Sequence, residues 1–159
     1  MRAAIALALL LRGGCPGGGG GGPPEPRTCT SPSAPSTPFT VDMGDAHSPW
    51  PDGKVVQLET GGQGFRMLPV RTYVGSPSAP SCVMQDLDVR IDGQDAGGAL
   101  YNLALTRNAS GQYVSDAVYV IIFGPYPGAE VSVTASIAGQ STTRRWYLER
   151  LPSPADAGL

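Results

Sequence analysis

Four aspartates fall within residues 86–95, and carboxylate oxygens gathered in this way are the ligands that calcium prefers. If residues 83–91 form a strand, the first two acids share their face with Arg90, which would neutralise them. The other two flank an expected Asp-Gly turn, and the spacing does not fit an EF-hand loop. We therefore expect a solvated strand face followed by a turn, with a calcium site as the alternative. The four residues are Asp86, Asp88, Asp92 and Asp95.

Three tyrosines are candidates for binding a glycan, because exposed aromatic rings can stack on sugar rings. Tyr73 and Tyr147 are expected on outward strand faces, and Tyr126 lies in a Pro-Tyr-Pro loop. The same side chains also serve as ordinary cross-strand packing partners. A glycan site is thus a hypothesis that requires the three rings to share one surface.

Residues for nucleophilic or metal catalysis are scarce. His47 is the single histidine, and it stands in an expected linker where no packing would hold its imidazole beside a nucleophile. One histidine also leaves zinc without its usual ligands. The few glutamates are expected in the linker or on outward strand faces, which disfavours a glycosidase pair. We expect a protein that is not an enzyme and that needs no cofactor.

The first residues resemble the signal peptide of a bacterial lipoprotein. Arg2 is followed by an apolar run over 3–11, by two glycines and by Cys15. The run is far shorter than the roughly 20 residues needed to cross a bilayer. The resemblance implies a signal peptide over 1–14 and a lipid on Cys15, which anchors the chain at the outer membrane or cell surface. Arg12 departs from the lipoprotein pattern, so an ordinary secretory signal cleaved near Gly13 or Gly14 is the alternative.

Cysteine usage agrees with export. With Cys15 assigned to lipid, Cys29 and Cys82 form an even pair in a chain expected in an oxidising compartment. We expect a disulfide between them. No CxxC motif is present, so a zinc ribbon or thioredoxin-like site is excluded.

Glycine and proline divide the chain. Most of the segment before Lys54 is rich in these residues together with Ser and Thr, and six consecutive glycines occupy 17–22. Such a segment cannot bury enough apolar surface to order itself, so we expect a disordered linker over 15–53 and a flexible tail over 152–159. With 13 acidic against 11 basic residues, the net charge of −2 offers no surface for nucleic acid.

From residue 54 onward the apolar residues recur with a period of two, which is typical of strands. We expect a strand over 67–74 that Pro69 demotes toward a sheet edge or a bulge, and a fully apolar strand over 118–123 buried in the centre of a sheet. The clearest alternation, over 130–137, points Val131, Val133 and their like-spaced neighbours inward. Seven strands are expected in all, over 55–59, 67–74, 83–91, 101–106, 118–123, 130–137 and 145–149.

Seven short strands with turns about every ten residues predict a single all-β domain over 54–151, an antiparallel sandwich. The pattern resembles the immunoglobulin-like and fibronectin-III-like sandwiches of bacterial envelope proteins. The Gly61–Gly64 turn and the run from Pro127 to Tyr147 resemble predicted lipoproteins of high-GC soil bacteria of the myxobacterial type. That group implies no activity.

Two functions are therefore weighed. The first is a non-enzymatic envelope lipoprotein that displays an immunoglobulin-like domain for adhesion, scaffolding or assembly, with the membrane and another envelope component as partners. The second is a glycan- or calcium-binding module.

Overall fold

A computed structural model describes residues 25–60, 65–123 and 128–149 of the chain. The described residues form ten β-strands and contain no helix, so the predicted all-β class is confirmed. The strands are β1 (Thr40–Gly44), β2 (Val55–Val56), β3 (Glu59–Thr60), β4 (Arg66–Gly75), β5 (Cys82–Ile91), β6 (Gln94–Arg107), β7 (Tyr113–Ser115), β8 (Val118–Ile122), β9 (Glu130–Ile137) and β10 (Gln140–Leu148).

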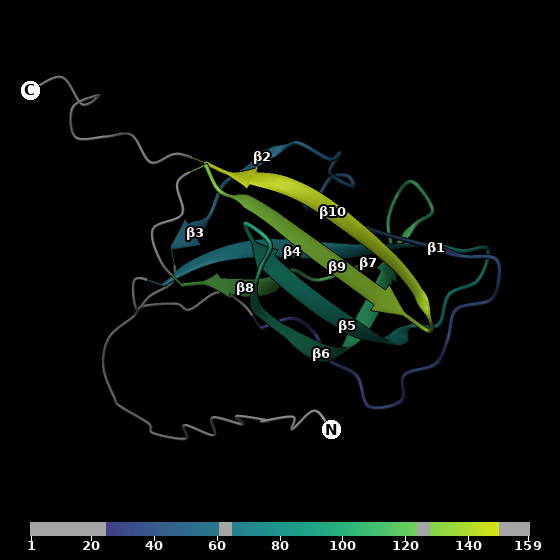
Figure 1. Cartoon of the computed structure of the whole chain (residues 1–159). Coiled ribbons are helices and arrows are strands. Elements are labelled where there is room, and N and C mark those ends of the chain that lie inside the picture. Colours follow the sequence, from purple (N-terminus) through teal and green to yellow (C-terminus); the bar gives the residue numbers. More distant parts are fainter. Residues whose placement is uncertain (1–24, 61–64, 124–127, 150–159) are drawn as a thin grey trace, which may run out of the picture.

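The strands join into one hydrogen-bonded sheet, in the order β1-β4-β7-β6-β5-β9-β10-β2, with β3 and β8 as further partners of β4. All pairs are antiparallel except β10 with β2. The sheet curls strongly, and in Figure 1 the β9–β10 hairpin overlies β4 and β1. Thr142 of β10 accordingly donates a hydrogen bond to the Val41 carbonyl of β1, two strands far apart in the sheet order. The described strands thus form one continuous, curled sheet.

Two hairpins have the tight turns that their sequences favour. Asp92 and Gly93 both have positive φ angles, 46° and 78°, between β5 and β6. Ala138 and Gly139 repeat this arrangement, at 48° and 81°, between β9 and β10. Positive φ at both central residues matches the twist of the flanking strands. The Asp-Gly turn was evident in the sequence, whereas Ala138 adopts its φ without that signal.

The concave face of the curled sheet encloses the hydrophobic core. Val131, Val133, Ala135 and Ile137 of β9 are all buried, and the residues between them are half-buried. The predicted inward set of this strand is therefore confirmed. Trp146 of β10 is fully buried and meets Trp50 edge-to-face, with ring centroids 4.9 Å apart.

Part of the expected linker belongs to the folded sheet. β1 lies within 15–53 and pairs with β4 in register Thr40↔Gly75 to Gly44↔Arg71. Phe39, Val41, Met43 and Trp50 are buried in the core. These four apolar side chains offset the ordering cost of a segment whose composition alone predicts disorder. Residues 1–24 and 150–159 lie outside the described residues, as do the signal peptide and tail predicted there.

The predicted positions of two strands in the sheet are reversed. β4 contains Pro69 yet pairs with β1, β3, β7 and β8. Residues 68–70 pair with β8 on one side and with none of the described strands on the other, so a missing backbone donor is tolerated there. β8 was expected in the centre of a sheet. It pairs with β4 alone among the described strands.

Within the described residues there is no helix with the length and hydropathy to cross a membrane.

Candidate functional site

The curled sheet has an opening between β6 and β8. On one edge β6 pairs with β5 over 94–104, with a shift of register beside Ala96. On the other edge it pairs with β7 only at 105–107. Next to β7 on this edge, residues 27–29 pair with β6 through the Thr28↔Leu103 bridge. We call residues 27–29 the arm. Beyond the arm, residues 94–101 of β6 and 118–123 face each other, and neither edge pairs with another described strand. We call this opening the seam groove.

The direction of the backbone groups along β6 follows from one hydrogen bond. The Leu105 amide donates to the Ser81 carbonyl, so Leu105 turns its backbone groups toward β5. In an antiparallel ladder these groups alternate in direction from one residue to the next. The Ala104 amide accordingly donates to the Arg27 carbonyl of the arm. By the same alternation Gly98 and Leu100 turn their amides and carbonyls into the seam groove.

The walls of the seam groove are apolar. Residues 96–99, which are alanine and glycine only, line the β6 side together with Tyr101, and Leu87 and Val89 of β5 line the groove too. Tyr119, Val120 and Ile121 form the β8 wall of this part, a cavity of about 230 Å³. Gly97 has a φ of 118°, a conformation that side-chain-bearing residues rarely adopt. The small residues leave room beside an edge whose backbone groups pair with no other described strand.

The outer end of the groove is exposed and acidic. Phe123, 65% exposed, lines a second cavity of about 400 Å³ with Asp92 and Asp95. Its ring meets Phe65 edge-to-face, with centroids 6.0 Å apart. Among the described residues no Lys or Arg lines either cavity. The groove thus offers apolar walls, unused backbone groups and negative charge at one end.

An ion pair marks the closed end. Arg27 of the arm donates from Nε and Nη2 to the two carboxylate oxygens of Asp116, at 2.6 and 3.0 Å, and from its backbone amide at 3.2 Å. Asp116 stands between β7 and β8, and Arg71 approaches it at 3.8 Å. The hydrogen bonds from Arg27 lower the pKa of Asp116, against the opposing effect of burial. The arm is therefore held where β6 and β8 begin to diverge.

A separate, polar cleft of about 300 Å³ adjoins the seam groove at Tyr119. His47, Glu59, Arg71 and Tyr119 line it, from the loop after β1 and from β3, β4 and β8. Burial and the charge of Glu59 raise the pKa of Tyr119, while Arg71 acts in the opposite direction. The phenol therefore stays a neutral hydrogen-bond donor. The cleft presents donors and acceptors of the kind that hold a small polar ligand.

Asp45 organises the loop that carries His47. Its carboxylate accepts hydrogen bonds from the amides of His47 and Ser48 and, at 2.8 Å, from Trp50 Nε1. Burial alone would raise its pKa, but these bonds and Lys54 together lower it to about 2. Lys54 also lies over the Trp50 ring, 4.7 Å from its centroid. The loop is thus fixed by one carboxylate.

The four predicted calcium ligands are not brought together. Asp88 pairs with Arg90 at 3.3 Å, Asp92 accepts from the Glu130 amide, and Asp95 accepts from the Gly97 amide. Asp86 is exposed on the outward face of β5. No group of three or more potential metal ligands occurs in the described part of the chain. The expected solvated face and Asp-Gly turn describe these residues well.

The predicted tyrosines do not form one surface. Tyr73 was expected to point outward, but it is buried and donates a hydrogen bond from its hydroxyl to the Asp45 carbonyl at 2.7 Å. It is buried because β4 lies between β1 and β7 and is covered on both faces there. Tyr147 is 43% exposed on β10, as expected. Tyr126 lies outside the described residues, as does Cys15.

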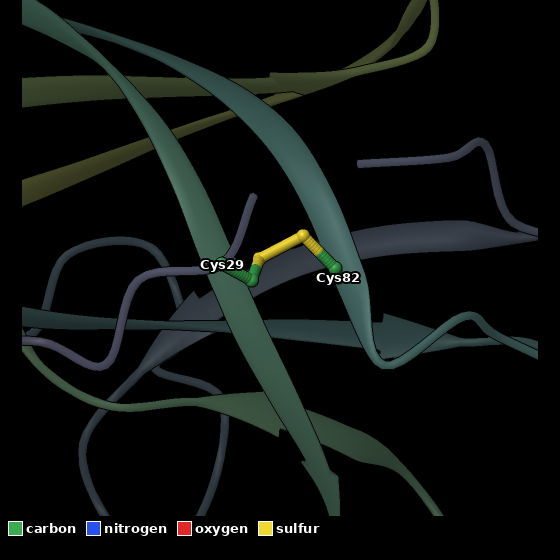
Figure 2. Close-up of a disulfide and its surroundings, with 2 residues drawn as sticks. All are labelled: Cys29 and Cys82. Carbon is green, nitrogen blue, oxygen red and sulfur yellow. A yellow bond between two sulfur atoms is a disulfide. The ribbon is translucent and has the colours of Figure 1, made fainter. Parts of the chain in front are cut away.

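The predicted cysteine pair is present. A disulfide joins Cys29 of the arm to Cys82 at the start of β5, with Cα atoms 5.9 Å apart. Figure 2 shows the bond reaching from the arm, where it lies along β6, to β5. The disulfide therefore fixes the arm beside the closed end of the seam groove.

Apart from Asp92 and Asp95, the residues that line the two openings were not among the candidates from the sequence. Tyr119 lines the seam groove and the polar cleft, yet it was placed inside a buried apolar run. His47 was expected to be solvated, and it is exposed, but at the rim of the polar cleft. The run of small residues over 96–99 was a signal, because glycine within a strand often marks a close approach by another backbone.

No known protein family, curated protein or solved structure matches this chain.

Proposed function

We propose that the chain is a non-enzymatic envelope lipoprotein. In this proposal a lipid on Cys15 anchors it at the outer membrane or cell surface, and the folded region is displayed for adhesion, scaffolding or assembly of another envelope component. The observation that carries the binding role is the seam groove, where two sheet edges without a described partner strand flank apolar walls. A disulfide between Cys29 and Cys82 supports the exported location, since such bonds persist in oxidising compartments.

The proposal includes an immunoglobulin-like sandwich as the underlying architecture. Two contacts across the core support it: the hydrogen bond from Thr142 to the Val41 carbonyl, and the edge-to-face contact of Trp50 with Trp146. Both bring the β1 side of the curled sheet against β10, as the two layers of a sandwich would be.

Cell fractionation tests the anchor. We expect the parent chain to sediment with membranes and Cys15→Ala to appear in the soluble fraction. A double variant, Cys29→Ala with Cys82→Ala, keeps the lipid acceptor and serves as the matched control, so it should remain with the membranes. Equal membrane association of the parent and Cys15→Ala would contradict the proposal.

A second candidate function is glycan binding at the polar cleft. It is favoured by the convergence of His47, Glu59, Arg71 and Tyr119 on one opening. A glycan array with the purified chain tests it, with Tyr119→Ala expected to lose the signal. Tyr147→Ala removes an exposed tyrosine that does not line the cleft, and it should bind as the parent does. Equal binding by both variants would exclude the cleft.

A further inference from the structure

The seam groove combines backbone groups that pair with no other described strand, a cavity with apolar walls, and an acidic end. An exposed strand edge is a template for pairing with another extended chain. We propose that the seam groove binds an extended polypeptide strand of a partner protein, which pairs with β6 and fills the space before β8. This inference rests on the proposed function and names its partner class.

The arm pairs with β6 in the way that we propose for the partner strand. Residues 27–29 already pair antiparallel with 102–104 of β6, on the edge that continues into the groove. After Cys29 the chain leaves this edge, and the Ser33 amide donates to the Cys82 carbonyl of β5 instead. A partner strand would take the place that a straight continuation of the arm would occupy. It would run antiparallel to β6 and use the backbone groups of Gly98 and Leu100.

Size and charge define the occupant further. A strand along residues 94–101 would contribute about six residues, at roughly 3.3 Å each. Small or β-branched side chains on alternate positions suit the narrow space between Ala99 and Val120. Because an antiparallel strand ends near Asp95 and Asp92, a basic residue at its C-terminal end complements the acidic end of the groove. A glycan would supply neither the backbone ladder nor this charge.

The test measures binding of one defined probe to the oxidised full-length chain. The probe is a fluorescein-labelled peptide, Thr-Val-Thr-Val-Thr-Arg-amide, followed by fluorescence anisotropy. One control peptide carries N-methyl groups on alternate amides, and another has Glu in place of Arg. Because backbone hydrogen bonds and the terminal charge carry the recognition, each control should bind at least about tenfold more weakly. Equal binding of the N-methylated peptide would overturn the proposal.

Protein variants locate the probe. Ala99→Trp fills the groove from the β6 wall and should weaken binding by about tenfold or more. Ile121 is an exposed residue of the β8 wall, so Ile121→Lys should weaken binding by repelling the basic end of the peptide while leaving the buried side chains in place. Met84→Trp adds the same large ring to an exposed position of β5 away from the groove and should bind as the parent does. Thermal melts establish that each variant is folded.

The outcomes separate this inference from the proposed function. No saturable binding, or binding that neither groove variant changes, overturns the strand-binding inference and leaves the fractionation test of the lipid anchor as it was. Concentration-dependent dimerisation that Ala99→Trp abolishes would assign the groove to a second copy of the chain and also overturn it. Release of the parent chain from membranes would refute the anchor without affecting the peptide measurement.

Discussion

Arg27 and Asp116 lie 89 residues apart in the sequence, yet Arg27 Nε donates a 2.6 Å hydrogen bond to Asp116 Oδ2. The pair holds the arm against the junction of β7 and β8, where the sheet opens into the seam groove. The backbone amide of Arg27 donates to the same carboxylate. Asp116 therefore holds both the side chain and the backbone of the arm at this residue.

Removal of this charge should loosen the arm. In Asp116→Asn we expect a loss of about 1 kcal/mol or less, because Arg27 is largely exposed and water screens the pair. The more specific change is faster hydrogen exchange at the Ala104 amide, which donates to the Arg27 carbonyl. Asp88→Asn removes an exposed carboxylate paired with Arg90 and should change neither quantity. Unaltered exchange at Ala104 in Asp116→Asn would contradict the role of the pair.

Substitutions at neighbouring positions of β9 test the sheet register. Val133 is fully buried opposite Val89, so Val133→Asp should cost about 3 kcal/mol or more and unfold much of the protein. Ser132 lies opposite Arg90 and Arg145, so Ser132→Asp should be tolerated within about 1 kcal/mol. Chemical denaturation measures both. A one-residue shift of register would reverse the two results.

Removing one member of the buried, hydrogen-bonded pair Thr72 and Gln85 should destabilise the protein. Thr72 Oγ1 donates to Gln85 Oε1 at 2.8 Å, while Gln85 Nε2 has no partner among the described residues. Thr72→Val leaves the buried amide unpaired and should cost about 1–3 kcal/mol. The double variant, with Gln85→Leu added, removes both polar groups and should recover at least that loss. Additive costs in a double-mutant cycle would contradict this coupling.

Acid should weaken the fold through Asp45. The pKa of its carboxyl is lowered to about 2 in the folded chain, below the ordinary value of 3.8. The stabilisation is therefore complete above about pH 4, and it is lost as the pH falls toward 2. Because the side chain is partly exposed, the contribution is about 1 kcal/mol. Unfolding free energies of the parent and Asp45→Asn should converge across this window. A constant difference down to pH 2 would contradict the assignment.

Loss of the disulfide should lower the melting temperature substantially. A cross-link between residues 53 positions apart is worth up to about 4 kcal/mol on the loop-entropy account. Cys29→Ser with Cys82→Ser should therefore lower the melting temperature more than Asp116→Asn does, and the Ala104 amide should exchange faster as the arm loosens. An unchanged melting temperature would show that the arm contributes nothing to the fold.

Period-two patterns predicted the strands over 83–91 and 130–137 well, but β6 and β10 begin several residues before the expected 101 and 145, and β1 and β7 were not predicted. The inward and outward residues of β5, β9 and β10 follow their alternation. The same alternation does not predict where in the sheet a strand lies. The apolar run over 118–123 reads as a central strand, yet its outer edge faces the seam groove, so its apolar side chains line an opening.

Composition was a poor guide at the front of the chain. Phe39, Val41 and Met43 alternate with Thr40 and Asp42, but this short period-two pattern stands among the Pro, Gly and Ser residues that predict a linker. Their burial depends on β4, β9 and β10, which lie far away along the chain. A local pattern cannot show such partners. Cysteine counting succeeded there because pairing required only the number of available thiols and the compartment.

Amide exchange along β6 tests the central claim, that the seam groove is open in the free chain. The amides of Ala99 and Tyr101 turn toward β5, whereas those of Gly98 and Leu100 turn into the groove. We predict slow exchange at Ala99 and Tyr101 and fast exchange at Gly98 and Leu100 when NMR follows the oxidised full-length chain. Leu100 protected as strongly as Tyr101 would mean that the edge is already paired, and it would contradict the account.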